Sequence, residues 1–194
     1  MKKSFLFFCA ISFGLAIVVS CNDQQAQEPL ADGSLSADSL VKRGEYLVTV
    51  IGCGDCHSPK VMGPQGPMPA PGLELSGHPA SLPIPKVDTS ELRSWALFNH
   101  SNTAVAGPWG VSFAANITGD STGIGAWTEA QFFRAMREGK YKGLENSRPL
   151  LPPMPWMNYT RMKDIDLKSI YAYLKTTGVK NLVPAAIPPT ALGK

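Results

Sequence analysis

The segment Cys53–His57, with the sequence CGDCH, constrains the fold of this chain more than any other feature. Two residues separate its thiols, and an imidazole directly follows the second thiol. At this spacing the two sulfurs can form thioethers with the two vinyl groups of one haem, and the histidine can bind the iron from the same side. The segment therefore predicts one covalently attached haem c, bound through Cys53 and Cys56 and ligated by His57.

Paired cysteines have other uses, and each of them fits this sequence less well. A thiol–disulfide redox motif usually opens a helix after a strand and needs no histidine behind it. A zinc site takes about four ligands. Beyond the segment only His78 and His100 remain, and their spacing matches no recognisable metal site. A structural disulfide across two residues would be strained.

The two other cysteines lie near the N-terminus. Cys9 falls in the apolar stretch 4–20, which follows two lysines, and this pattern is typical of a signal peptide. The stretch is short for a membrane span, which needs about 20 residues. It ends in VVSC, which resembles the bacterial lipobox and implies cleavage after Ser20 and lipid attachment at Cys21. Ordinary signal cleavage, leaving a free thiol at Cys21, is the alternative.

The chain is expected to divide into four parts. Residues 1–20 form the signal peptide, and residues 21–36 are polar without an apolar period, as in a flexible tether. Residues 37–178 have the length of one folded domain. Residues 179–194 form a proline-containing tail that we expect to be extended or disordered.

Three segments of the domain have helical periodicity, and long Gly- and Pro-rich loops separate them. The pattern predicts helices over residues 39–51, 127–138 and 164–177, the second with a capping box at its start. Gly44 lies on the apolar face of the first helix, where glycine costs about 1 kcal/mol relative to alanine. We interpret Gly44 as the site of a close crossing with another helix, although an incidental glycine is the alternative.

An iron bound by His57 has a second axial position, and the proline-rich run 150–157 (LLPPMPWM) offers methionines for it. A thioether ligand favours ferrous iron and raises the reduction potential, and prolines reduce the entropy lost when such a loop closes. Met154 and Met157 are both candidates. His78 and His100 are alternatives that would give a lower potential. The second ring nitrogen of His57 should donate to a carbonyl, and several downstream prolines offer one.

The order of these segments resembles the class I cytochrome c fold over roughly residues 36–178. The runs RGEYLV, NITGD, TGIGAW and MPW are similar to a bacterial group of monohaem domains that includes cytochrome subunits of membrane-bound dehydrogenases. This resemblance implies a mainly α domain, with about three main helices and long loops around one haem.

The resemblance also implies roles for individual residues. In that family the methionine of the Met-Pro-aromatic run is the distal ligand, which favours Met154 over Met157. The family's first and last helices cross at a glycine–aromatic contact, which implies Gly44 with Tyr173. The residues implied to pack around the haem are Tyr46, Asn116 and Trp127. The stretch 58–115 is longer than in a minimal cytochrome c, and we expect it to cover one haem edge or to dock a partner.

Together these features predict an electron-transfer cytochrome rather than an enzyme, since no nucleophile–base pair, phosphate loop or second metal site is recognisable. The expected location is the periplasmic side of the bacterial cell envelope, with a lipid anchor. Without the two signal lysines, the chain has 16 basic side chains (18 minus 2) and 15 acidic ones. This nearly neutral net charge argues against a nucleic-acid partner. A redox protein or a respiratory or dehydrogenase complex is the expected partner. A relay subunit of a larger oxidoreductase and a haem-based ligand sensor are the alternatives.

Overall fold

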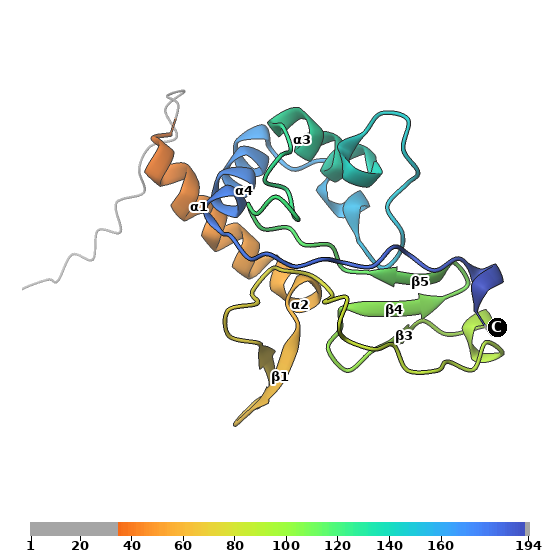
Figure 1. Ribbon diagram of the computed structural model, residues 1–194. Helices are drawn as coiled ribbons and strands as arrows, with labels where there is room; N and C mark the ends of the chain where they lie inside the picture. The colour runs from red at the N-terminus through yellow and green to blue at the C-terminus, as the bar shows by residue number, and fades with distance from the viewer. Residues whose placement is uncertain (1–34, 193–194) are drawn as a thin grey trace, which may run out of the picture. The chain divides into compact units, whose positions relative to one another are not determined.

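The computed structural model describes residues 35–192, and Figure 1 shows their fold. The proposed signal peptide, Cys21 and all but the last residues of the tether lie outside the described residues. The helices are α1 (Ala37–Val50), α2 (Cys53–His57), α3 (Glu129–Glu138) and α4 (Asp164–Thr176), with short 3-10 helices η1 (Glu91–Arg93), η2 (Tyr141–Gly143), η3 (Trp156–Tyr159) and η4 (Pro189–Ala191). The strands are β1 (Lys60–Gly63), β2 (Gly66–Pro69), β3 (Leu97–Phe98), β4 (Ala104–Gly107) and β5 (Gly110–Phe113).

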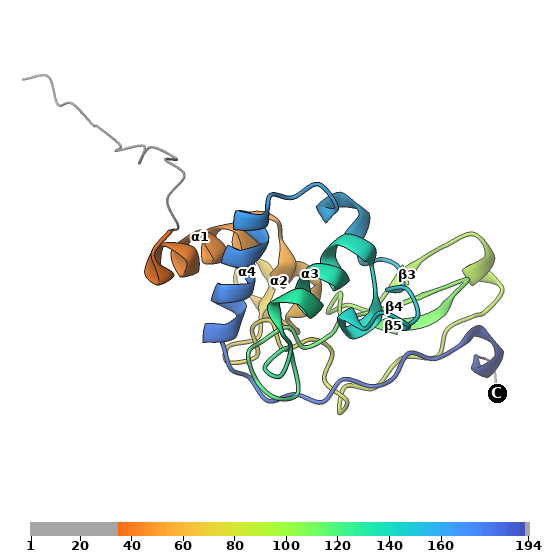
Figure 2. The ribbon, with the colours of Figure 1, turned by 90° about the horizontal axis from the view of Figure 1, so that it is seen from above.

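The first and last long helices, α1 and α4, lie side by side, as both ribbon views show (Figures 1 and 2). Gly44 lies at their crossing. A Cβ atom placed on Gly44 would be 2.6 Å from the carbonyl carbon of Ser169, closer still to its oxygen, and 2.7 Å from Cβ of Tyr173. No larger residue therefore fits at this position without separating the two helices.

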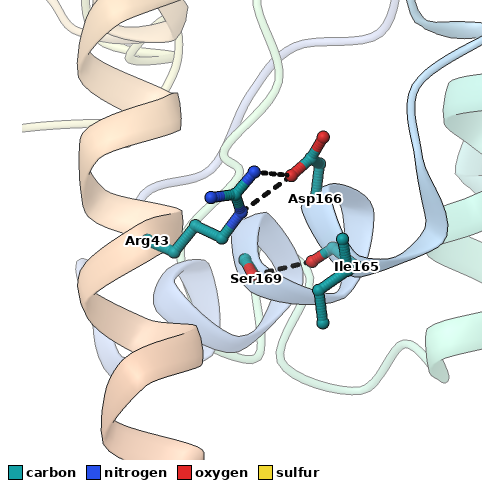
Figure 3. A network of polar contacts seen from close by, with 4 residues as sticks. All are labelled: Arg43, Ile165, Asp166 and Ser169. Carbon is teal, nitrogen blue, oxygen red and sulfur yellow. Dashed lines mark hydrogen bonds and ion pairs between the residues drawn. The ribbon is translucent and has the colours of Figure 1, made fainter. Parts of the chain in front are cut away.

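A polar contact next to this crossing ties the same two helices together (Figure 3). Both Nε and one terminal nitrogen of Arg43 donate to Oδ1 of Asp166, at 2.8 and 2.5 Å. On α4 the buried Ser169 hydroxyl donates back to the Ile165 carbonyl at 2.7 Å, so this side chain is satisfied within its own helix. The apolar residues of the crossing carry most of its stability, because a partly exposed ion pair contributes only about 0 to 1 kcal/mol.

The main hydrophobic core lies between α1, α3, α4 and the loops next to them. Its buried members are Val48, Leu75, Ile124, Phe132, Leu167, Ile170 and Leu174. A second cluster lies on the sheet β3-β4-β5, around Leu92, Ala104, Ala106 and Val111. Two of the seven main-core residues, Leu75 and Ile124, come from loops, so the loops are part of the packed domain.

Helix α3 begins and ends as its sequence predicts, apart from two residues at its start. The Thr128 side chain accepts from the Gln131 backbone, and the Gln131 side chain accepts from the Thr128 backbone, which completes the capping box. Gly139 ends the helix in a left-handed conformation with φ of 64°. Trp127 precedes the cap and packs against the core.

The stretch expected to contain only loops, 58–115, instead contains five short strands. β1 and β2 form one antiparallel hairpin, and β3, β4 and β5 form a three-stranded antiparallel sheet. The expectation of a mainly α domain thus holds only loosely, since two small sheets accompany the helices. Strands of two to four residues are too short to produce a recognisable alternation of apolar and polar side chains.

Residues 179–188 run in extended conformation as far as η4 and bond to the rest of the domain. Ile187 exchanges two backbone hydrogen bonds with Val111 of β5, at 2.8 and 2.9 Å. The Asn181 side chain donates to the Ser76 carbonyl at 2.8 Å. Among the described residues, no helix has the length and apolar character needed to cross a membrane.

Candidate functional site

Helix α2 carries both thiols and the imidazole of the predicted attachment segment on five residues. It follows Gly52, which makes the turn from α1 with a φ of 77°. Residues with a Cβ atom rarely adopt this left-handed conformation. At its other end the Lys60 ammonium donates to the carbonyls of Gly54, Asp55 and Ser58, at 2.8, 3.1 and 2.6 Å. A cation at the C-terminal end of a helix interacts favourably with its last carbonyls. The short helix is therefore held at both ends.

The two thiols of α2 are free and half-buried. Burial, with a smaller contribution from the nearby Asp55 carboxylate, raises the pKa of the Cys53 thiol to about 11. Burial also raises the pKa of Cys56, again with a contribution from Asp55. Thiol–disulfide redox motifs need a thiolate, which a lowered pKa provides. The environment of this pair thus disfavours thiol–disulfide exchange. It is compatible with thiols that are converted into thioethers.

His57 is oriented by a backbone carbonyl. Its Nδ1 lies 2.7 Å from the carbonyl oxygen of Ala115 and donates to it, which leaves Nε2 as the nitrogen with a free lone pair. Burial lowers the pKa of the His57 ring, outweighing the opposite effect of this hydrogen bond. The ring is therefore neutral at pH 7, as a metal ligand must be. The acceptor belongs to an alanine, not to one of the downstream prolines that the sequence suggested.

A glycine brings the Ala115 carbonyl to His57. The Gly77 amide donates to the His57 carbonyl at 2.7 Å, while the next amide, of His78, donates to the Ala114 carbonyl at 2.9 Å. Gly77 has a φ of 76°, and a Cβ there would be 2.6 Å from the Ala115 oxygen. The segment around Gly77 is thus bonded to the backbone on both sides of the His57–Ala115 contact, with no space for a side chain.

The proline-rich run 150–157, here called the methionine loop, lies between α3 and α4 and is anchored at its two ends. The Leu150 amide donates to the Gly139 carbonyl at 2.6 Å, and the Trp156 ring packs against Gly139, where a Cβ would lie 2.7 Å from its Nε1. Met154 is half-buried in this loop, whereas Met157 is 67 % exposed. The structure thus places the two candidate ligands in different environments.

Tyr159 is a site residue that the sequence analysis missed. Burial raises the pKa of its hydroxyl, and the negative charges of the Cys53 and Cys56 thiolates raise it further, so the two sulfurs lie within electrostatic range of Tyr159. It belongs to η3, which directly follows the methionine loop in the chain. A tyrosine five residues after Met154 carries no recognisable motif, so the sequence offered no signal for it.

The other residues expected around the haem lie in different places. Asn116 is buried and binds its own loop to the C-terminal segment, with Oδ1 accepting from the Thr118 amide at 2.9 Å and Nδ2 donating to the Val179 carbonyl at 2.8 Å. Trp127 packs against the main core. Tyr46, on α1, is 65 % exposed.

The two alternative histidine ligands differ in burial and in hydrogen bonding. His78 is fully buried, and its ring nitrogens bond the Thr103 hydroxyl at 2.9 Å and the Leu82 carbonyl at 3.3 Å. Because both nitrogens have protein partners, this ring is not free to bind a metal. His100 is exposed in the turn between β3 and β4.

The donor groups that the structure assembles fit haem c. Two free thiols and a neutral imidazole lie on one five-residue helix, and the loop between α3 and α4 carries the Met154 thioether. Thioethers from paired cysteines with a His and a Met on the iron are the ligation of cytochromes c. Within residues 35–192, no group of three or more His, Cys, Asp or Glu side chains could hold a metal ion.

Known proteins with similar sequences point to the same chemistry, although no protein-family model matches the chain. The chain is 34 % identical over 145 residues to the gluconate 2-dehydrogenase cytochrome c subunit of Pantoea cypripedii, covering 74 % of this chain and 24 % of that protein. It is 39 % identical over 159 residues to a nicotinate dehydrogenase subunit of Pseudomonas putida, covering 81 % and 10 %. It is 30 % identical over 138 residues to the fructose dehydrogenase cytochrome subunit of Gluconobacter japonicus, covering 70 % and 21 %. The chain thus spans a quarter or less of the length of these relatives.

Proposed function

The chain is a c-type cytochrome, homologous to cytochrome c subunits of dehydrogenases, and we propose that it passes single electrons between redox partners through one haem c. The observation that carries this proposal is the geometry of α2. Its two thiols stand beside a histidine whose Nδ1 is committed to the Ala115 carbonyl at 2.7 Å, so that Nε2 is available to iron.

In this proposal four side chains hold the haem. Cys53 and Cys56 would bind it covalently, and His57 Nε2 and the Met154 sulfur would hold its iron. The bound group supplies a reversible one-electron change between ferric and ferrous iron. Met154 is preferred to Met157 because it is half-buried in the anchored loop, whereas Met157 is 67 % exposed.

The protein's own groups set the properties of this site. The Ala115 carbonyl fixes the plane of the His57 ring and makes its Nε2 a stronger ligand. Burial of the ring disfavours its protonated form, so protons compete weakly with iron. If His57 and Met154 both held the iron, small molecules would find no open position on it, which would favour electron transfer over ligand sensing. The crossing of α1 and α4 at Gly44 supports assignment of the domain to the class I cytochrome c fold.

The partner and the cellular location rest on sequence. The relatives include cytochrome subunits of gluconate, fructose and alcohol dehydrogenases, which supports a dehydrogenase as the electron donor. The signal peptide at 1–20 and a lipid on Cys21 would hold the domain on the periplasmic side of a membrane. When membranes are solubilised in mild detergent, a relay subunit should be isolated together with the other subunits of its complex. A free shuttle should be isolated without them.

A spectrum of the purified holoprotein tests the ligand assignment. Met-ligated ferric haem has a weak absorption band at the red end of the visible range. We expect this band in the native protein and in Met157→Ala, and its loss in Met154→Ala. Rapid binding of carbon monoxide to the native ferrous protein would contradict the proposal, because it requires an open axial position.

A further inference from the structure

One side-chain hydrogen bond joins the three-stranded sheet to the methionine loop. The Ser112 hydroxyl on β5 lies 2.5 Å from the carbonyl oxygen of Pro152, a residue 40 positions further along the chain. Ser112 is 7 % exposed, so its hydroxyl has little access to water as a substitute partner. Pro152 lies two residues before Met154.

The neighbouring groups determine which way the Ser112 hydroxyl points. Nε1 of Trp109 lies 3.2 Å from the Ser112 oxygen, and an indole nitrogen can only donate. The hydroxyl therefore accepts from Trp109 and has one proton of its own to donate. Its possible acceptors are the Pro152 carbonyl at 2.5 Å and the Val105 carbonyl at 3.4 Å, and the much shorter distance assigns the proton to Pro152.

The Trp109 ring is itself held in place by the turn between β4 and β5. It packs against Gly107, where a Cβ atom would lie 2.5 Å from ring carbon Cζ3. Gly107 and Gly110 are directly opposite each other in the hairpin, so the indole lies over its end. The donor that orients Ser112 is therefore part of a rigid hairpin.

The middle of the methionine loop, residues 151–155, makes few other hydrogen bonds. Within residues 35–192, the Ser112–Pro152 contact is the one hydrogen bond that joins residues 151–155 to a part of the fold other than the loop itself and the adjoining η3. Three of these five residues are prolines, which have no amide hydrogen to donate. The Met154 amide bonds within the loop, to the Leu151 carbonyl at 3.3 Å.

We infer that Ser112 is a positioning residue that holds the Met154 loop closed, so that the three-stranded sheet controls how often Met154 leaves the iron. This inference rests on the proposed function, because it requires Met154 to be the axial ligand. The sheet lies in the stretch 58–115, which is longer than in a minimal cytochrome c, and the inference gives part of that stretch a role at the axial site.

The test measures the affinity of the ferric holoprotein for added imidazole, which binds the iron only after Met154 has left. The apparent dissociation constant varies inversely with the fraction of molecules whose loop is open. Removing one hydrogen bond changes such an equilibrium by about five-fold. We expect Ser112→Ala to bind imidazole about five-fold more tightly than the native protein, and Ser112→Thr, which keeps a hydroxyl, to bind it close to natively.

The matched control is Ser101→Ala, which removes a hydroxyl that is 2 % exposed in the turn before β4 and makes no hydrogen bond to the loop within the described residues. Its imidazole affinity should equal that of the native protein. Hydrogen exchange at the Met154 and Trp156 amides gives a second readout, and should speed up in Ser112→Ala alone. Trp109→Phe removes only the orienting donor and should give a smaller effect in the same direction, which keeps the test open if Ser112→Ala fails to load haem.

The outcomes separate this inference from the proposed function. A native protein with the red band, together with equal imidazole affinities in Ser112→Ala and Ser101→Ala, would overturn the role of Ser112 while leaving Met154 as the ligand. A native protein without that band would overturn the Met154 assignment and the role of Ser112 together.

Discussion

Replacing Gly44 by alanine tests how closely α1 and α4 pack. The new Cβ atom would lie 2.6 Å from the Ser169 carbonyl carbon, whereas ordinary contacts of such an atom begin at 3.4 Å. The helices must therefore separate by at least about 0.8 Å at the crossing, because the Ser169 oxygen lies closer still to the new atom. The opposing atoms are backbone, so no side-chain rotation can relieve the clash.

The expected cost follows from two opposing terms. Overpacking of a well-packed core costs about 1 to 3 kcal/mol, and the upper end applies here because buried residues such as Val48 and Ile170 lie on both sides of the crossing. Alanine recovers about 1 kcal/mol of helix propensity relative to glycine. The net loss is roughly 2 kcal/mol of unfolding free energy. For a chain of this length it lowers the melting temperature by about 4 to 8 °C.

Thermal unfolding of the holoprotein, followed by far-ultraviolet circular dichroism, measures this shift. Gly178→Ala is the control, since no atom lies within 4 Å of a Cβ placed there and its φ is not positive. The control should melt within about 1 °C of the native protein, because surface substitutions change stability little. If Gly44→Ala melts at or above the native temperature, the close crossing does not exist in solution and the packing argument is refuted.

Three further predictions concern the site and its surroundings. Gly77→Ala should lower stability by at least about 1 kcal/mol in urea titrations, since it combines a positive φ with a clash against Ala115, and it should also change the reduction potential by moving the His57 acceptor. Met154→Leu should lower the potential in a redox titration, whereas Met157→Leu should leave it unchanged, because only the first removes a ligand that favours ferrous iron. Burial lowers the pKa of His78, so the unfolded chain binds a proton more readily there than the folded protein does. Stability from this residue is therefore complete above about pH 6.5 and is lost as the pH falls below it, and His78→Gln should flatten that dependence in urea titrations at pH 7.5 and 5.5.

Local features of the fold could be read from the sequence because their causes are local. The capping box of α3 depends on Thr128 and Gln131, three residues apart, and Gly139 ends the helix through its own backbone freedom. Ser36 caps α1 in the same way, accepting from the Ser39 amide at 3.2 Å. The strands escaped prediction because β3 has only two residues and β1, β2, β4 and β5 have four each, which is too few for a periodic pattern.

In the candidate site, too, the features with local causes could be predicted from the sequence and the long-range contacts could not. The attachment segment is contiguous, so the sequence contains its chemistry in full. The contacts that orient it join distant parts of the chain: Ala115 is 58 residues from His57, and Ser112 is 40 residues from Pro152. Neither contact depends on a motif, since one acceptor is a backbone carbonyl and the other pair is a serine with a proline carbonyl. Such contacts follow from the fold and become visible only with it.

The Ala115 carbonyl has a consequence for which substitutions this site tolerates. A hydrogen-bond acceptor that belongs to the backbone is present whichever amino acid occupies the position, so mutation of residue 115 cannot delete it. The orientation of His57 is therefore protected against side-chain replacement at its own contact. It is vulnerable at Gly77 instead, a residue that never touches the ring and that decides where the carbonyl lies. A search for inactivating mutations should thus find them at the glycine rather than at the residue that makes the bond.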